Sequence, residues 1–128
     1  MSGERMSASQ SKPKVLVVDD ERVIADTLAI ILNQHGFDAA AVYTGTQAVE
    51  RAKNVRPDLV ISDVIMPDMN GIETAINIRK FLPGCKILLF SGQAATADLL
   101  ESARAQGHEF EILAKPVHPQ DLLAKLKA

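Results

Sequence analysis

The chain has 128 residues, 47% of them apolar, and a formal net charge of −2. This length and composition fit one globular domain with a substantial core. The 14 Lys and Arg residues are scattered, so no basic stripe indicates nucleic-acid binding. No apolar run is long enough to span a bilayer, and the single cysteine cannot form an internal disulfide. We therefore expect a cytoplasmic protein that binds neither nucleic acid nor membranes.

The first segment, residues 1–12, is polar and Ser-rich. It has no apolar stretch of the kind found in a secretory signal, and we expect a flexible N-terminal tail. Residues 13–128 should form one domain with no linker and no second module.

Strand-like and helix-like stretches alternate five times along the remaining chain. Strands are predicted, in chain order, over residues 14–18, 37–42, 58–63, 86–90 and 111–114. A helix is predicted after each strand: from the residue after Asp20 to His35, from Thr44 past Ala52, and over 71–81, 94–105 and 119–127. The alternation predicts an α/β fold with a doubly wound, five-stranded parallel sheet and helices on both faces.

Polar side chains follow four of the predicted strands. Asp19 and Asp20 follow the first strand, Asp63 ends the third, Ser91 follows the fourth and Lys115 the fifth. Open parallel sheets bind ligands outside the carboxyl ends of their strands, where the strand order reverses. In the flavodoxin-like order 2-1-3-4-5, the first and third strands are neighbours, which would bring the three aspartates into one crevice.

Three carboxylates close together repel one another, and a divalent cation would relieve that repulsion. Oxygen-only ligation is the usual pattern for Mg²⁺. Lys115 would add a positive charge and Ser91 a hydroxyl donor, so together they could hold a phosphoryl group. Asp63 would be the nucleophile.

Each of these residues also has an ordinary structural explanation. Asp63 could form a helix cap or an Asx-turn, and Asp20 could cap the first helix. Ser91 could be a turn residue, and Lys115 could be a solvated lysine. The functional interpretation depends on all of them occurring together. Cys85, before the fourth strand, is expected to behave as a small apolar residue rather than as a nucleophile.

The chain resembles the receiver domain of two-component response regulators from about Lys14 to Lys127. The resemblance lies in four motifs: Val15-Leu16-Val17-Val18-Asp19-Asp20-Glu21, Asp63-Val64-Ile65-Met66-Pro67-Asp68-Met69-Asn70-Gly71-Ile72-Glu73, Ser91-Gly92 and Leu113-Ala114-Lys115-Pro116.

The resemblance implies that Asp63 accepts phosphate from a phosphohistidine on a histidine kinase or a histidine phosphotransfer protein. It also implies Mg²⁺ ligation by Asp20, Asp63 and the backbone carbonyl of Ile65, with Asp19 acting through water. Ser91 and Lys115 would contact the phosphoryl group. Pro67, Gly71 and Pro116 would be structural, and the Lys115-Pro116 peptide bond would be cis.

One departure concerns the switch that reads out phosphorylation. The family usually has Tyr or Phe three residues before the lysine, whereas this chain has Ile112. Phe110 shares a predicted strand face with Ile112 by period-two alternation, so it could supply a displaced ring. Alternatively, Phe110 only packs against the preceding helix, and the swinging-ring coupling is absent.

Four functions fit these features to different degrees. We expect a stand-alone phosphorylation switch, a monomer or weak homodimer, that contacts an unknown downstream protein. The contact face would comprise the helix over 94–105, the strand over 111–114 and the helix over 119–127. The alternatives are a phosphate shuttle or sink in a relay, a degenerate receiver used only for interaction, and a hydrolase with an aspartyl-phosphate intermediate. The hydrolase ranks last, because phosphatases of that type carry a second acid two residues after the nucleophile, and Ile65 stands there.

Overall fold

Strands and helices alternate throughout the computed structural model, which describes residues 12–92 and 96–127. The strands are β1 (Lys14–Val18), β2 (Asp38–Val42), β3 (Leu59–Asp63), β4 (Lys86–Ser91) and β5 (Glu111–Ala114). The helices are α2 (Arg22–Gln34), α3 (Gly45–Val55), α4 (Gly71–Phe81), α5 (Thr96–Ala105) and α6 (Pro119–Lys127).

The strands form one parallel sheet in the order β2-β1-β3-β4-β5. This confirms the predicted fold class and strand order. The first and third strands are direct neighbours, with Val18 paired to Ser62. The residues that follow this pair, Asp19 and Asp63, therefore lie side by side at the carboxyl ends of the two strands.

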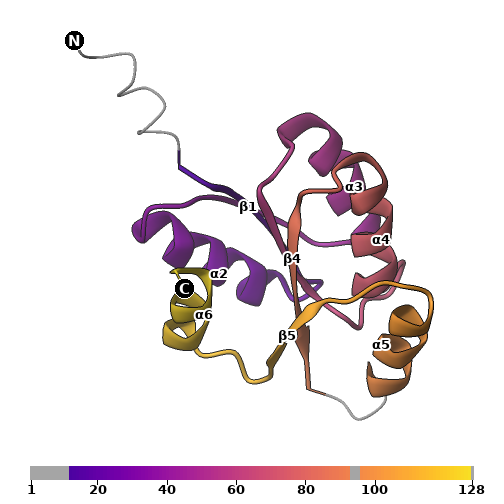
Figure 1. The fold of residues 1–128 in the computed structure, drawn as a ribbon. Coiled ribbons are helices and arrows are strands. Elements are labelled where there is room, and N and C mark those ends of the chain that lie inside the picture. The colour runs from indigo at the N-terminus through magenta and orange to yellow at the C-terminus, as the bar shows by residue number, and fades with distance from the viewer. Residues whose placement is uncertain (1–11, 93–95, 128) are drawn as a thin grey trace.

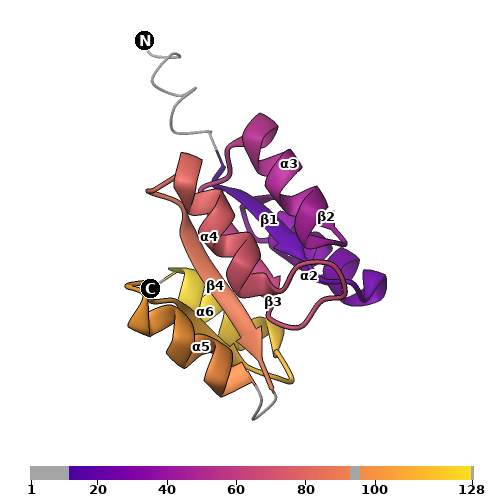
Figure 2. The same ribbon diagram turned by 90° about the vertical axis from the view of Figure 1, so that its right-hand side faces the viewer.

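Helices cover both faces of the sheet (Figures 1 and 2). Along β1, Val15 and Val17 pack into the apolar cluster shared with α2 and α6. The alternate residues, Leu16 and Val18, pack into the cluster shared with α3, α4 and α5. A central strand enclosed in this way must be apolar on both sides. That is why β1 and β3 appear in the sequence as continuous apolar runs.

The helix starts differ in how they are capped. The Thr44 side chain accepts a hydrogen bond from Gln47 N at 3.0 Å and caps α3. Asn70 and Glu73 form a reciprocal capping box at α4. Glu21 occupies the cap position of α2 without a side-chain cap bond. The alternative in which Asp20 caps this helix is therefore wrong.

A few predicted bounds shift by one residue. The second strand begins at Asp38 rather than residue 37, the third begins at Leu59 rather than residue 58, and the fourth includes Ser91. The predicted tail, except for Lys12, and residues 94–95 of the predicted fourth helix lie outside the described residues. None of the helices in the described ranges combines the length and apolar character that a bilayer span requires.

Candidate functional site

Three aspartates meet at the carboxyl ends of β1 and β3. Asp19, Asp20 and Asp63 each offer a carboxylate oxygen, and these oxygens all lie within 4.8 Å of one another. Asp19 is fully buried and Asp63 is 7% exposed, whereas Asp20 is exposed. The structure therefore brings the predicted acidic set together at the switch point of the sheet.

The surroundings of the Asp19 carboxylate disfavour its charged form. Its Oδ1 accepts a hydrogen bond from Glu21 N at 3.0 Å. Its Oδ2 is the one buried side-chain oxygen or nitrogen of the described residues without a hydrogen-bond partner. Burial, with added repulsion from Asp63, raises the pKa of Asp19 to about 6. A buried acceptor beside two more carboxylates fits a hard, oxygen-seeking cation such as Mg²⁺.

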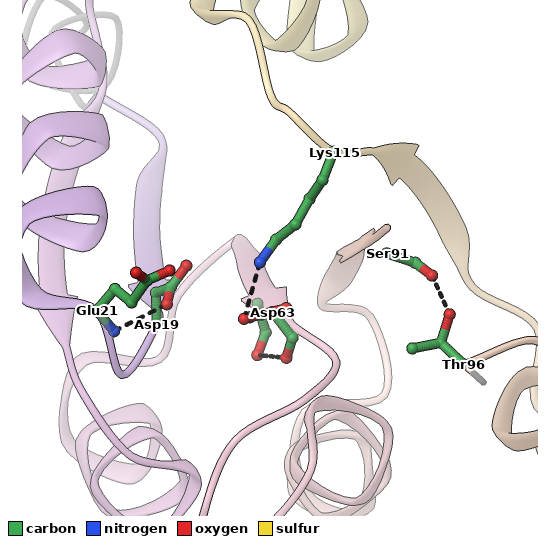
Figure 3. A network of polar contacts seen from close by, with 7 residues as sticks. Asp19, Glu21, Asp63, Ser91, Thr96 and Lys115 are labelled. Atoms are coloured by element: carbon green, nitrogen blue, oxygen red, sulfur yellow. Dashed lines mark hydrogen bonds and ion pairs between the residues drawn. The ribbon is translucent and has the colours of Figure 1, made fainter. Parts of the chain in front are cut away.

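Lys115 faces Asp63 across the crevice (Figure 3). Its Nζ donates a hydrogen bond to Asp63 Oδ2 at 3.0 Å, from a side chain that is 32% exposed. Burial alone would lower the pKa of Lys115, but the hydrogen bond and negative charge of Asp63, together with Asp19 and Glu21, outweigh burial and raise it. The lysine is thus a fixed positive charge at the predicted phosphoacceptor. The Lys115-Pro116 peptide bond is cis, as predicted.

A cavity of about 230 Å³ opens beside this ion pair, and Asp63, Ser91, Lys115 and Thr96 all line it. The Ser91 hydroxyl is hydrogen-bonded to the Thr96 hydroxyl. Figure 3 shows that Ser91 points toward Thr96 and away from Asp63. Ser91 is the last residue of β4, so the alternative of an ordinary turn residue does not apply. The motifs did not identify Thr96, and its position at the start of a helix gave no signal in the sequence.

The loop after β3 brings the start of α4 against the backbone of Asp63. Gly71 N donates to Val64 O at 2.7 Å, which brings the start of α4 against the end of the strand. A Cβ at Gly71 would collide with the backbone carbonyl of Asp63. This close approach explains the structural role predicted for Gly71. The Ile65 side chain is 49% exposed and also lines the cavity, and Pro67 is exposed in the loop.

Asp68 ties the same loop to a different helix, a contact that sequence reasoning missed. Its carboxylate accepts hydrogen bonds from Thr46 Oγ1 at 2.7 Å, Thr46 N at 3.0 Å and Gly45 N at 3.1 Å. These bonds, led by that from the Thr46 hydroxyl, lower the pKa of Asp68 to about 2. The loop that follows Asp63 is therefore anchored at the start of α3.

Ser91, Phe110 and Ile112 were assigned to the switch, and the last two lie in different environments. Ile112 is 36% exposed on β5, which is an edge strand. Phe110 precedes this strand, which begins at Glu111, so the argument from strand alternation was wrong. The Phe110 ring packs against the core cluster that includes α4 and α5, and the Arg79 guanidinium lies 4.8 Å from its centroid. Arg79 also donates to Glu109 O at 3.1 Å, which holds the segment against α4.

Residues 15–127 match the family model described as "Response regulator receiver domain". The chain belongs to this family. Receiver domains characteristically combine phosphorylation on aspartate with Mg²⁺, and they interact with histidine kinases or phosphotransfer proteins. They are signalling domains rather than conventional enzymes. The resemblance stated from the motifs is therefore confirmed.

Individual relatives differ in how much of their length this receiver covers. It is 34% identical over 114 residues to the chemotaxis protein CheY of Thermotoga maritima, spanning 88% of this chain and 93% of that protein. It is 33% identical over 117 residues to the DNA-binding response regulator MtrA of Mycolicibacterium paratuberculosis, spanning 91% of this chain. The receiver spans about half of the length of MtrA, 51%.

A solved structure gives the same picture of the fold. The CheY-like receiver domain protein of Methanospirillum hungatei superposes with a TM-score of 0.81 at 31% identity, over 91% of this chain and 92% of that chain.

Proposed function

We propose that this receiver accepts a phosphoryl group on Asp63 from a phosphohistidine of a histidine kinase or histidine phosphotransfer protein, and that it signals by phosphorylation-dependent protein contact. The observation that supports this most directly is the Asp63 carboxylate itself. It lies between the Lys115 ammonium, at 3.0 Å, and the two other aspartates, at the edge of a cavity large enough for a phosphoryl group.

In the transfer step, a carboxylate oxygen of Asp63 attacks phosphorus in line with the phosphorus–nitrogen bond of the phosphohistidine. The new phosphorus–oxygen bond forms as the phosphorus–nitrogen bond breaks, and the bonding electrons leave with the imidazole. Lys115 offsets negative charge on the phosphoryl oxygens and holds one Asp63 oxygen in place. The protein mainly positions the reactants and neutralises their charge.

Asp20, Asp63 and the backbone carbonyl of Ile65 would hold Mg²⁺, with Asp19 acting through water. The unpartnered Oδ2 of Asp19 supports a cation at this place. The bound ion would supply positive charge against the phosphoryl oxygens. Without it, Asp63 would face the donor's phosphate beside two further carboxylates, which is electrostatically unfavourable.

The proposed output surface comprises α5, β5 and α6. β5 is a free sheet edge in the described part of the chain, and its Ile112 presents an aliphatic side chain to solvent. A phosphorylation-dependent shift of α5 relative to this edge would change the surface that a downstream protein meets.

Phosphoryl transfer can be tested with acetyl phosphate or a phosphorylated kinase in the presence of Mg²⁺. We expect the wild type to incorporate one acid-stable, base-labile phosphoryl group, and EDTA to abolish it. Asp63→Asn should take up no label. Asp38→Asn is the matched control, because Asp38 is an exposed aspartate at the opposite end of the sheet. Equal labelling of the Asp63→Asn and Asp38→Asn proteins would exclude Asp63 as the acceptor.

A phosphate shuttle or sink is the second candidate, and the aromatic residues favour it. The position three residues before Lys115 is the aliphatic Ile112, and the nearby Phe110 ring lies under Arg79. A ring that stays in this contact would not provide the family's usual conformational output. A shuttle would return phosphate rapidly from Asp63 to a histidine phosphotransfer protein. A stable, beryllofluoride-dependent complex with a third protein would instead support the switch.

A further inference from the structure

Thr96 is a buried polar residue at the site that none of the sequence motifs includes. It is 1% exposed, it begins α5, and it lines the same cavity as Asp63 and Lys115. Its hydroxyl is hydrogen-bonded to Ser91, the residue expected to contact the phosphoryl group. Figure 3 shows the Ser91 hydroxyl turned toward Thr96 rather than toward Asp63.

We propose that Thr96 is a positioning residue that holds the Ser91 hydroxyl in the unphosphorylated protein, and that phosphorylation of Asp63 exchanges this bond for one between Ser91 and a phosphoryl oxygen. The proposal rests on the proposed function, because it requires a phosphoryl group on Asp63. It adds a residue that sets the equilibrium between the two states.

The exchange follows from the direction of the Ser91 hydroxyl. Ser91 Oγ is turned toward Thr96 and away from Asp63, so whichever of the two hydroxyls donates, Ser91 must rotate away from Thr96 to donate its proton to a phosphoryl oxygen. A bond to an anionic oxygen is about twice as strong as one between two neutral groups. The phosphoryl group therefore competes successfully for Ser91, whereas in its absence Thr96 retains it.

The backbone around Ser91 allows the side chain to change partner without leaving the sheet. Ser91 O accepts a hydrogen bond from Lys115 N at 3.2 Å, which fixes the end of β4 against the end of β5. The rotation is therefore confined to the side chain. The rotation affects α5, because it breaks the direct hydrogen bond between the first residue of that helix, Thr96, and the Ser91 hydroxyl.

The bond to Thr96 stabilises the unphosphorylated state alone, so its removal should favour the phosphorylated state. The expected gain in affinity for a phosphoryl mimic is about two- to twelvefold, the equilibrium value of one neutral hydrogen bond. The opposite role, in which Thr96 itself binds the phosphoryl group, predicts a loss of affinity in the same variant.

The experiment measures beryllofluoride affinity in Mg²⁺ by titrating backbone amide resonances in isotope-labelled protein. Thr96→Val removes the hydroxyl while nearly preserving the shape of the side chain, and Thr96→Ala is a second truncation. Both should bind beryllofluoride about two- to twelvefold more tightly than wild type. Thr96→Ser keeps the hydroxyl and should restore the wild-type affinity. Thermal melts of each variant check that it is folded.

A double-mutant cycle with Ser91→Ala separates positioning from a general packing effect. If Thr96 acts through Ser91, then Thr96→Val should leave beryllofluoride affinity unchanged in the Ser91→Ala background. A packing effect would persist there. Persistence of the effect, unchanged affinity in the Thr96→Val single variant, or weaker binding would each overturn the proposal.

The same experiment distinguishes failure of this inference from failure of the proposed function. If wild-type Asp63 is labelled normally but the double-mutant cycle shows no coupling between Ser91 and Thr96 in beryllofluoride affinity, only the positioning role is refuted. Absence of labelling and of beryllofluoride binding in the wild type refutes the proposed function, and the exchange of partners falls with it.

Discussion

Gly71→Ala tests how the fold positions Asp63. A Cβ at residue 71 would collide with the carbonyl oxygen of Asp63 and lie 3.0 Å from Val64 Cα. Both are backbone atoms, so the strain cannot be relieved by rotating a side chain. Overpacking of this kind costs about 1–3 kcal/mol, and alanine recovers up to about 1 kcal/mol through its helix propensity. The expected net loss of about 1–2 kcal/mol lowers the melting temperature by roughly 4–8 °C.

Gly84→Ala is the matched control, because a Cβ at Gly84 meets no atom within 4 Å. It should be neutral or stabilising by up to about 1 kcal/mol. Circular dichroism melts of the two variants give the stability difference, and beryllofluoride titration gives the effect on the site. Gly71→Ala should also bind the mimic more weakly, because the strand end that carries Asp63 must move. If both variants melt and bind alike, the close approach of α4 to β3 does not position the site.

Three further outcomes follow from charge and burial. The Asp68 carboxylate should stabilise the protein above about pH 4 and lose this contribution as pH falls toward 2, because its folded pKa of about 2 lies below its ordinary 3.8. Asp68→Asn should therefore lower the free energy of unfolding in urea by about 1 kcal/mol at neutral pH, a figure that already allows for solvent exposure of the carboxylate. In acid, the same substitution should have little effect. Asp19→Asn removes a buried charge with an unpartnered oxygen, so it should raise the melting temperature of the metal-free protein. The same variant should be stabilised less by Mg²⁺. A lower metal-free melting temperature would contradict this prediction. Burial raises the pKa of Cys85 to about 11, so Ellman's reagent at about pH 8 should label the folded protein far more slowly than the urea-unfolded chain.

The sheet could be predicted because its central strands are enclosed on both faces and appear as unbroken apolar runs. The strand ends were harder to place, because apolar character does not say where a backbone group finds its partner. Phe37 shows this clearly. Its side chain packs against the cluster shared with α2 and α6, but its N–H donates to Leu32 O at 3.1 Å. It therefore closes the end of α2 instead of extending β2.

The acidic set could also be predicted, because parallel topology alone brings the ends of neighbouring strands together. The contacts that helices make with loops could not be predicted from the sequence. Asp68, in the loop after β3, contacts Thr46 at the start of α3, and Thr96, at the start of α5, contacts Ser91. No local pattern specifies where these two helices lie. The alternative role of Asp20 as a helix cap failed for a related reason. The Asp19 carboxylate accepts the Glu21 N–H, and the helix begins after Glu21.

The departure from the family pattern at Ile112 bears on how phosphorylation could be read out. Phe110 lies under the Arg79 guanidinium and against the core, and Ile112 has no ring to move. A coupling through a swinging aromatic side chain would require the Phe110 ring to leave the Arg79 guanidinium and the core. The Ser91 hydroxyl, however, is bonded directly to the start of α5 through Thr96. This arrangement favours a readout that begins with a change of hydrogen-bond partner and reaches the outer face through the helix rather than through a ring.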